Sequence, residues 1–243
     1  MRILVTRPEP DATALKAQLI ARGHEVLIEP LLRIEYQPLD DLDLDGVQAL
    51  IATSRNGVRA LAHSPLLEPA QVLPIYTVGP GTAATATALG FPQVIEGPRD
   101  ARQLITLIAL HADINAGPLV YLSGDRPAAD VAGELRRLGF HVLEPVAYAT
   151  TLADRLSPAV VARFEAAEID AVVLLSAQTA RTYARLTLAH GLGRNRERVR
   201  HICLSTAVAR GLAALAPAHV AVAVQPDLQE MLALIDRSEP LLP

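Results

Sequence analysis

Hydrophobic positions along the chain fall into two alternating patterns. Short aliphatic or β-branched runs, typical of strands, are followed by Ala-, Leu- and Arg-rich stretches whose apolar residues recur at helical spacing. This alternation predicts strand–helix units around parallel sheets. Ten strands are more than one doubly wound sheet usually carries, so we expect two five-stranded sheets. The expected strands are residues 2–6, 25–29, 48–53, 75–78, 93–95, 119–123, 141–145, 171–175, 200–204 and 219–223.

Three pairs of segments resemble each other, which indicates that the two sheets belong to similar units. The pairs are residues 6–30 with 125–145, 49–61 with 171–183, and 74–91 with 201–215. The second pair aligns Ser54 with Ser176, and the third aligns Thr82 with Thr206. The sequence therefore predicts an α/β fold of two similar doubly wound, parallel-sheet domains of the flavodoxin-like type.

The strand count divides the chain discontinuously. Residues 46–145 already supply five strands, so they form one expected domain, and residues 1–30 combine with 155–243 to form the other. The two connections, residues 31–45 and 146–154, both begin with an apolar, extended-looking run. We expect them to cross between the domains side by side as a two-stranded linker.

The composition narrows the classes of partner. The chain has 243 residues, of which 51 % are hydrophobic and 20 % charged, as in ordinary globular proteins. Its formal charge of −4 predicts no nucleic-acid partner. No apolar run approaches the roughly 18 to 20 residues of a membrane span, and no signal peptide is recognisable, so we expect a cytoplasmic protein without a membrane contact. Cys203 is the single cysteine, which excludes an intramolecular disulfide and a cysteine-based zinc cluster.

Serine or threonine occurs in every predicted strand-to-helix turn: "VTRP", "ATSRNG", "VGPGT", "LSGDRP", "LLSAQT" and "CLSTA". Each hydroxyl alone is best interpreted as a helix cap. Together, in domains facing each other across a hinge, they can line a cleft for a ligand with several anionic groups. The residues are Thr6, Ser54, Thr82, Ser123, Ser176, Ser205 and Thr206, with Arg7, Arg55 and Arg126 as charged supplements.

A glycine-rich turn adds a nucleotide-binding alternative. Gly79, Gly81 and Ala84 fit the pattern G-x-G-x-x-G/A, and Glu96 follows 17 residues after Gly79. The related turn "CLSTA" keeps neither glycine, and Pro80 removes one N–H from the loop, which favours a tight turn instead. An NAD(P)-dependent oxidoreductase and a non-catalytic two-domain ligand-binding sensor are the alternative functions.

Other catalytic arrangements find little support. The seven histidines are scattered, and neither H-E-x-x-H nor G-x-S-x-G occurs. Tyr36 and Tyr148 lie on the two crossing segments, next to the inferred cleft. Tyr148 could therefore place a phenolic O–H, able to donate or accept, against a bound ligand.

Taken in order, the short motifs resemble the uroporphyrinogen-III synthase family over essentially the whole chain. They are "VTRP", "GHEV", "TSRNGV", "VGPGTA", "GDRP" with "LGF" further on, "PVAYATT", "LLSAQTA" and "STA". The resemblance implies two α/β domains joined by a two-stranded linker, with the active site between them. It also implies a cyclising lyase of tetrapyrrole (haem) biosynthesis. Such an enzyme converts hydroxymethylbilane into uroporphyrinogen III with loss of water and inversion of ring D, and uses no metal or cofactor.

The resemblance further implies roles for individual residues. Tyr148 matches the family's tyrosine on the second crossing and would aid departure of the substrate hydroxyl. Many members have an arginine where this chain has Ala128, and here Arg126 lies two residues earlier. We expect a monomer, with hydroxymethylbilane synthase as a candidate transient partner. The expected substrate-binding residues are Arg7, Ser54, Thr82, Gly124, Arg126, Ser176, Ser205 and Thr206.

Overall fold

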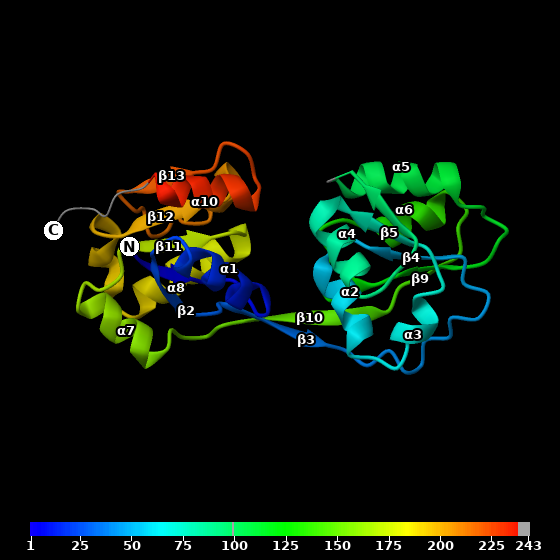
Figure 1. The fold of residues 1–243 in the computed structure, drawn as a ribbon, viewed down its shortest axis with the longest axis horizontal. Coiled ribbons are helices and arrows are strands. Elements are labelled where there is room, and N and C mark those ends of the chain that lie inside the picture. Colours follow the sequence, from blue (N-terminus) through cyan, green and yellow to red (C-terminus); the bar gives the residue numbers. More distant parts are fainter. Residues whose placement is uncertain (99, 238–243) are drawn as a thin grey trace. The chain divides into compact units, whose positions relative to one another are not determined.

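The chain divides into two compact units, each built around one five-stranded sheet (Figure 1). The computed structural model describes residues 1–98 and 100–237. Unit 1 combines residues 1–33 with the described part of 151–243, and unit 2 is residues 34–150. Within the described residues, no helix is long and apolar enough to cross a membrane.

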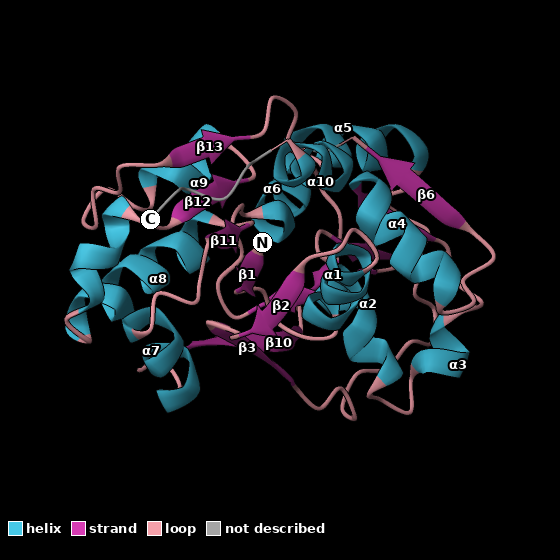
Figure 2. Ribbon diagram, turned by 60° about the vertical axis from the view of Figure 1, so that its left-hand side comes forward, coloured by secondary structure: helices cyan, strands magenta, loops and turns pink. Residues whose placement is uncertain are grey.

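Helices cover both faces of the sheet of unit 1 (Figure 2). Ile3 and Val5 pack on the side of α1 and α10, whereas Leu4, between them, packs on the side of α7, α8 and α9. Successive side chains of a strand point to opposite faces, so this strand is buried on both sides. The strands, all parallel, are in order β13 (Val220–Val222), β12 (Arg200–Cys203), β11 (Ala171–Leu174), β1 (Arg2–Val5) and β2 (Glu25–Ile28). The helices are α1 (Asp11–Ile20), α7 (Pro158–Glu165), α8 (Ala177–Ala189), α9 (Thr206–Arg210) and α10 (Leu228–Asp236), with the 3-10 helix η1 (Leu192–Glu197) after α8.

Unit 2 repeats this two-sided arrangement. Leu50 packs with α2 and α4, whereas its neighbours Ala49 and Ile51 pack with α5 and α6. The strands, again all parallel, are in order β6 (Val94–Gly97), β5 (Ile75–Val78), β4 (Ala49–Ala52), β7 (Leu119–Tyr121) and β9 (Val142–Leu143). The helices are α2 (Arg55–Ala62), α3 (Leu67–Ala70), α4 (Gly79–Ala88), α5 (Ala101–His111) and α6 (Val131–Arg137).

The two sheets share one topology when the strands of unit 2 are counted from β7. Unit 1 then has β1, β2, β11, β12 and β13 where unit 2 has β7, β9, β4, β5 and β6. Both are the order 2-1-3-4-5 of flavodoxin-like sheets. The three echoing segment pairs fall on equivalent strands of the two sheets. The predicted fold class of two similar doubly wound parallel-sheet domains is confirmed.

A third, three-stranded sheet carries the chain between the units. Its order is β3 (Leu32–Tyr36), β10 (Val146–Leu152) and β8 (Ser123–Gly124). In unit 1 the Ala153 N–H donates to the Leu31 carbonyl at 3.1 Å, and in unit 2 the Gln37 N–H donates to the Ala147 carbonyl at 3.0 Å. The predicted linker of two neighbouring crossing strands is therefore present, with β8 as an additional partner.

All ten predicted strands are present, most of them one to three residues shorter than expected. Residues 119–123 do not form a single strand, because the ladder breaks at Leu122. The residues before the break pair with β4 and β9, whereas Ser123 and Gly124 pair with β10. The chain thus leaves the main sheet of unit 2 just before Gly124, one of the residues predicted to bind substrate.

Candidate active site

Each main sheet reverses its strand order at one point, between β1 and β11 in unit 1 and between β7 and β4 in unit 2. Open α/β sheets bind ligands beyond the carboxyl ends of the strands at such a point. Arg7 follows β1 and Ser176 follows β11. In unit 2, Ser54 follows β4, and Gly124 and Arg126 follow β7. Five predicted residues therefore flank the two points where this fold binds ligands.

Two predicted serines cap helices of unit 1. The Ser176 Oγ accepts a hydrogen bond from the Thr179 N–H at 3.1 Å, and the two hydroxyl oxygens lie 2.7 Å apart. The Ser205 Oγ accepts from the Val208 N–H at 3.4 Å. Thr206 is the first residue of α9 and is exposed, so its predicted capping role is wrong. A capping hydroxyl accepts through a lone pair and keeps its own proton. One of the two hydroxyl protons of Ser176 and Thr179 is used in the hydrogen bond between them, and the other can be donated to an anion.

Arg7 lies in the turn after β1 and is held by an ion pair. Its Nη2 is 2.8 Å from Oδ2 of Asp11, and the two side chains are only 14 % and 15 % exposed. Asp11 opens α1, where the helix dipole favours a carboxylate. The preceding Thr6 does not cap this helix as predicted, because its buried Oγ1 donates to the Val173 carbonyl at 2.9 Å. Thr6 joins β1 to β11 across the point of strand reversal.

At the corresponding point of unit 2, two hydroxyl groups connect the ends of β4 and β7. Thr53 Oγ1 and the phenolic oxygen of Tyr121 lie 3.0 Å apart, at the ends of β4 and β7. Burial raises the pKa of Tyr121, so the phenol stays protonated. Ser54 follows with extended backbone, and its Oγ accepts from the Asn56 N–H at 3.2 Å as the cap of α2. The capping interpretation is thus confirmed for Ser54, Ser176 and Ser205.

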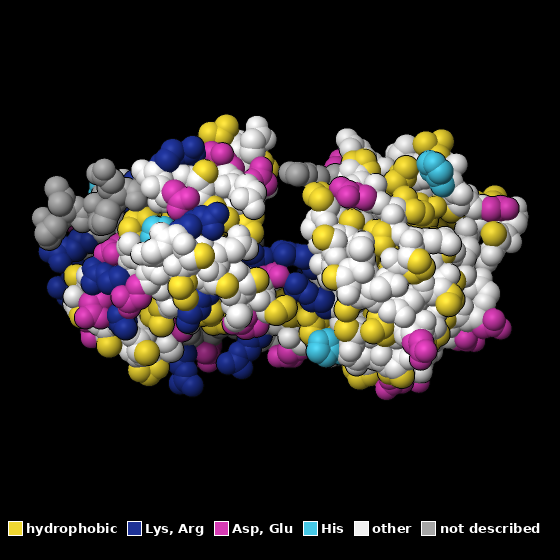
Figure 3. All heavy atoms as spheres, in the orientation of Figure 1, with side chains coloured by type: hydrophobic (Ala, Val, Ile, Leu, Met, Phe, Trp, Pro, Cys, Tyr) yellow, Lys and Arg dark blue, Asp and Glu magenta, His cyan; other side chains and the backbone are white. Residues whose placement is uncertain are grey.

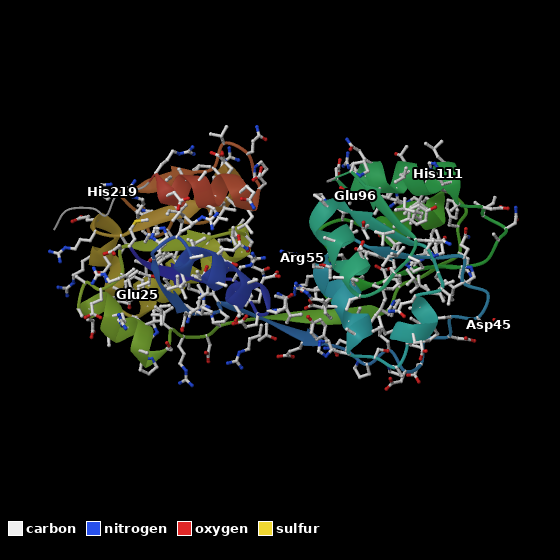
Figure 4. All side chains as sticks on the ribbon, viewed as in Figure 1. Glu25, Asp45, Arg55, Glu96, His111 and His219 are labelled. Atoms are coloured by element: carbon white, nitrogen blue, oxygen red, sulfur yellow. The ribbon has the colours of Figure 1, made fainter. Side chains whose placement is uncertain are left out.

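The glycine-rich turn forms the start of α4. Gly79 has φ +67°, a conformation that favours glycine, and the helix begins there with Val78 at its N-cap. Thr82 is consequently inside the helix and only 6 % exposed, so its predicted capping role is wrong. A Cβ on Gly81 would meet only the Arg55 Cδ, at 4.0 Å. Arg55, labelled in Figure 4 where α2 begins, therefore extends its stem over the first turn of α4.

Tyr148 projects from β10 and lies against Gly124. The strands β8 and β10 are parallel, with Gly124 opposite Tyr148. A Cβ on Gly124 would lie 2.7 Å from the Tyr148 Cζ and 2.9 Å from its phenolic oxygen. The Asp125 N–H donates to the Tyr148 carbonyl at 2.9 Å. The residue predicted to be catalytic and one predicted to bind substrate are thus neighbours, and the phenol is half-buried.

Ser123 and Arg126 flank the contact between Gly124 and Tyr148, and Ser123 does not have the role expected of it. Ser123 lies in a strand, and its Oγ donates to the Pro145 carbonyl at 3.3 Å, so it does not cap a helix as predicted. The Arg126 side chain is 75 % exposed, with its Nε 3.7 Å from Oδ2 of Asp125. The guanidinium therefore lies at the surface of its loop.

Charge is divided unevenly between the units. Unit 1 carries 15 Lys and Arg against 13 Asp and Glu, and unit 2 carries 7 against 13, which gives +2 and −6 and adds to the −4 of the chain. On the face drawn in Figure 3, the Lys and Arg side chains gather over unit 1. The more basic unit is thus the one that contains Arg7, Ser176 and Ser205.

One pocket of unit 2, about 470 Å³ in volume, lies away from these residues. It is lined by residues 38–39, 41–43 and 143–145. Asp41, Asp43 and Glu144 make its lining acidic, so it would repel a ligand that carries carboxylates. This pocket is not a candidate for the predicted anionic ligand.

The nucleotide pattern, the single cysteine and possible metal ligands are the remaining features with potential chemistry. The glycines of the nucleotide pattern belong to the first turn of α4, and Glu96 lies exposed on β6. Cys203 is buried, which raises its pKa to about 12 and keeps the thiol protonated. Among the residues that the structure describes, no group of three or more His, Cys, Asp and Glu could hold a metal ion.

Four residues of these sites were not among the predicted ones. Asp11 could have been found, because it lies four residues after Arg7, at helical spacing. Thr53, Tyr121 and Asp125 could not, because their contacts join segments far apart in the chain.

Comparison with known proteins identifies the family. The sequence model described as uroporphyrinogen-III synthase HemD matches residues 13–233. No curated protein matches the chain by sequence. Among solved structures, the chain is similar to uroporphyrinogen-III synthetase from Helicobacter pylori, with 20 % identity, a TM-score of 0.62, and coverage of 97 % of this chain and 98 % of that one. It is also similar to a mutant uroporphyrinogen III synthase from Thermus thermophilus, with 19 % identity, a TM-score of 0.53, and 98 % of each chain covered. These likenesses show the fold, and the family match spans nearly the whole chain: the chain belongs to the uroporphyrinogen-III synthase family.

Proposed function

We propose that the chain cyclises hydroxymethylbilane to uroporphyrinogen III, with loss of water and inversion of ring D. It is a cyclising lyase of tetrapyrrole biosynthesis. The family match supports this function. The structural observation that carries it is the half-buried phenol of Tyr148, fixed against Gly124 on a crossing strand.

The substrate chemistry fits the two sheet edges. Hydroxymethylbilane carries eight carboxylates, and helix N-termini with capping hydroxyls offer N–H and O–H donors to such groups. Ser176 and Ser205 supply these donors in unit 1, and Ser54 supplies them in unit 2. The proposed carboxylate ligands also include Arg7, Thr82, Gly124, Arg126 and Thr206.

Tyr148 supplies the proton in the proposed first step. The phenolic O–H donates to the oxygen of the substrate hydroxymethyl group, the carbon–oxygen bond breaks, and water leaves. The resulting azafulvene closes through a spiro intermediate in which ring D reverses, and the phenolate recovers a proton as the macrocycle regains its aromatic pyrroles. Such a route needs an oriented acid more than a strong nucleophile.

The product isomer tests this function. Fresh hydroxymethylbilane closes spontaneously to the type I isomer, so the fraction of type III product measures the enzyme. We expect type III from the purified protein, whereas type I alone would favour the ligand-binding sensor. An NAD(P)-dependent oxidoreductase would instead show a rise in melting temperature on addition of NAD(P).

The cellular setting is part of the same proposal. We expect a cytoplasmic monomer that takes hydroxymethylbilane from its synthase through a transient contact. Cell fractionation and size-exclusion chromatography test the first two statements. Channelling measured with a trap for free hydroxymethylbilane tests the third.

A further inference from the structure

The register of β10 against β8 contains an irregularity at the proposed catalytic tyrosine. Ser123 pairs with Val146, but the next residue, Gly124, pairs with Tyr148. Ala147 is thus an extra residue between two paired positions, and it is fully buried in the core of unit 2. A bulge of this kind bends a strand and re-aims the side chain beside it. Here that side chain is Tyr148.

Gly124 leaves space that the phenol ring occupies. A Cβ at this position would lie 2.7 Å from Cζ, 2.9 Å from Cε2 and 2.9 Å from the phenolic oxygen of Tyr148, closer than side-chain carbons normally approach. The backbone of Gly124 is not in the left-handed region, so its conformation does not itself require glycine. The position of the Tyr148 ring therefore explains why residue 124 is a glycine.

Asp125 fixes the main chain of β10 just after the tyrosine. Its N–H donates to the Tyr148 carbonyl at 2.9 Å, and its Oδ1 accepts from the Thr150 N–H at 3.1 Å. The first bond completes the Gly124–Tyr148 pair, and the second lies beyond it, where the ladder of the two strands has ended. The carboxylate thus replaces a missing backbone partner and keeps the β10 main chain in place.

We propose that Gly124 and Asp125 are positioning residues that hold the Tyr148 phenol in its reactive direction. Gly124 provides the surface on which the ring lies, and Asp125 locks the strand that carries it. This inference rests on the proposed function only for its effect on turnover, because the seating of the ring can be measured without substrate.

The first test uses 3-fluorotyrosine and fluorine NMR. The signal of Tyr148 is the one missing from the Tyr148→Phe variant. In Gly124→Ala the ring must give way to the new methyl group, so this signal should shift while the other tyrosine signals stay. Turnover should fall on the order of 100-fold, mainly in kcat, because displacement of a catalytic group by about 1 Å has such an effect. Gly193→Ala is the control, because a Cβ there meets only the Leu188 Cδ2, at an ordinary 3.4 Å.

The outcomes distinguish the positioning of the Tyr148 ring by Gly124 from the role of Tyr148 in the reaction. An unmoved Tyr148 signal in Gly124→Ala would overturn the positioning role. A shifted signal with reduced formation of type III product supports both the positioning of the ring by Gly124 and the role of Tyr148 in the reaction. A shifted signal with normal turnover supports the positioning of the ring and overturns the role of Tyr148 in the proposed function.

The second test separates a hydrogen bond from a charge at Asp125. Asp125→Asn keeps an oxygen that can accept from the Thr150 N–H, whereas Asp125→Ala does not. We expect Asp125→Ala to lower kcat about 2- to 10-fold, as for loss of one hydrogen bond, and Asp125→Asn to restore it. Equal losses in both variants would show that the charge matters, and would overturn the assignment of Asp125 as a positioning residue.

Discussion

Arg2 and Asp170 are joined by both main chain and side chain at the start of the sheet of unit 1. The Arg2 N–H donates to Oδ2 of Asp170 at 2.6 Å, and its guanidinium Nη2 lies 2.6 Å from Oδ1. The same Nη2 donates to the Ala167 carbonyl at 3.0 Å. The pair thus joins β1 to the turn before β11, the two strands at the point of reversal.

The Arg2–Asp170 pair predicts an acid-dependent loss of stability. Hydrogen bonds from Arg2 lower the pKa of Asp170 in the folded state. Its contribution is therefore complete above the unfolded pKa of about 4 and is lost as the pH falls through the lower folded pKa. Because Arg2 is partly exposed, we expect Asp170→Asn to cost about 1 kcal/mol at pH 7, or roughly 2–4 °C in Tm.

Thermal melts between pH 2 and pH 7 check this expectation. The Tm difference between wild type and Asp170→Asn should shrink in the acidic range, and the exposed Asp154→Asn should show no difference. A difference independent of pH would mean that the carboxylate charge is not what stabilises this edge.

His201 predicts a second pH effect, at milder acidity. The side chain is fully buried on β12, and its Nε2 lies 3.3 Å from the phenolic oxygen of Tyr183. Burial lowers the pKa of His201 from 6.5 to about 4. The unfolded chain therefore binds a proton before the folded one does, and stability falls as the pH drops from about 6.5 to about 4, by up to ~3 kcal/mol.

Denaturant unfolding at several pH values measures the His201 effect. His201→Gln should flatten the dependence in this window. His111→Gln serves as the matched control, because His111 is exposed on α5 (Figure 4). An unchanged slope in His201→Gln would assign the pH dependence to other groups.

The sequence predicts the sheets well because buried strands and helix caps are local signals. Each apolar run between helical stretches corresponds to a strand, and Ser54, Ser176 and Ser205 act as caps because each lies two residues after a strand and directly before a helix. Thr82 does not, because Gly79 starts its helix three residues earlier. In that turn, backbone conformation outweighs the preference of the hydroxyl for a cap.

The arrangement around Tyr148 could not be predicted because it depends on tertiary contacts. Gly124 precedes the tyrosine by 24 positions, and only the bulged pairing of β8 with β10 brings them together. The order of motifs along the chain is enough to place Tyr148 on a crossing strand. The residue that the phenol contacts depends on the register of β8 against β10, which cannot be read from the sequence.

Ser176 allows its capping role to be separated from its proposed binding role. Ser176→Asn and Ser176→Asp both keep an oxygen that can cap α8, whereas Ser176→Ala should cost about 1 kcal/mol of stability. The aspartate adds a negative charge at the proposed carboxylate site. We expect Ser176→Asp to melt near the wild-type temperature while its KM for hydroxymethylbilane rises about 10-fold, with Ser176→Asn much closer to wild type. Equal KM values for Asp and Asn would place the substrate carboxylates elsewhere.

Tyr148→Phe removes one oxygen atom and leaves the ring that rests on Gly124. The fold should therefore be unchanged, with the same circular dichroism and a similar Tm, because the phenol is only half-buried and the ring contacts remain. If the phenol donates the proton for departure of the hydroxyl, kcat for type III product should fall by about 10²- to 10⁴-fold, the usual contribution of a positioned acid. KM should change little, since other residues are proposed to bind the carboxylates of the substrate. A loss confined to KM would make Tyr148 a binding residue, and near-normal turnover would remove it from the reaction altogether.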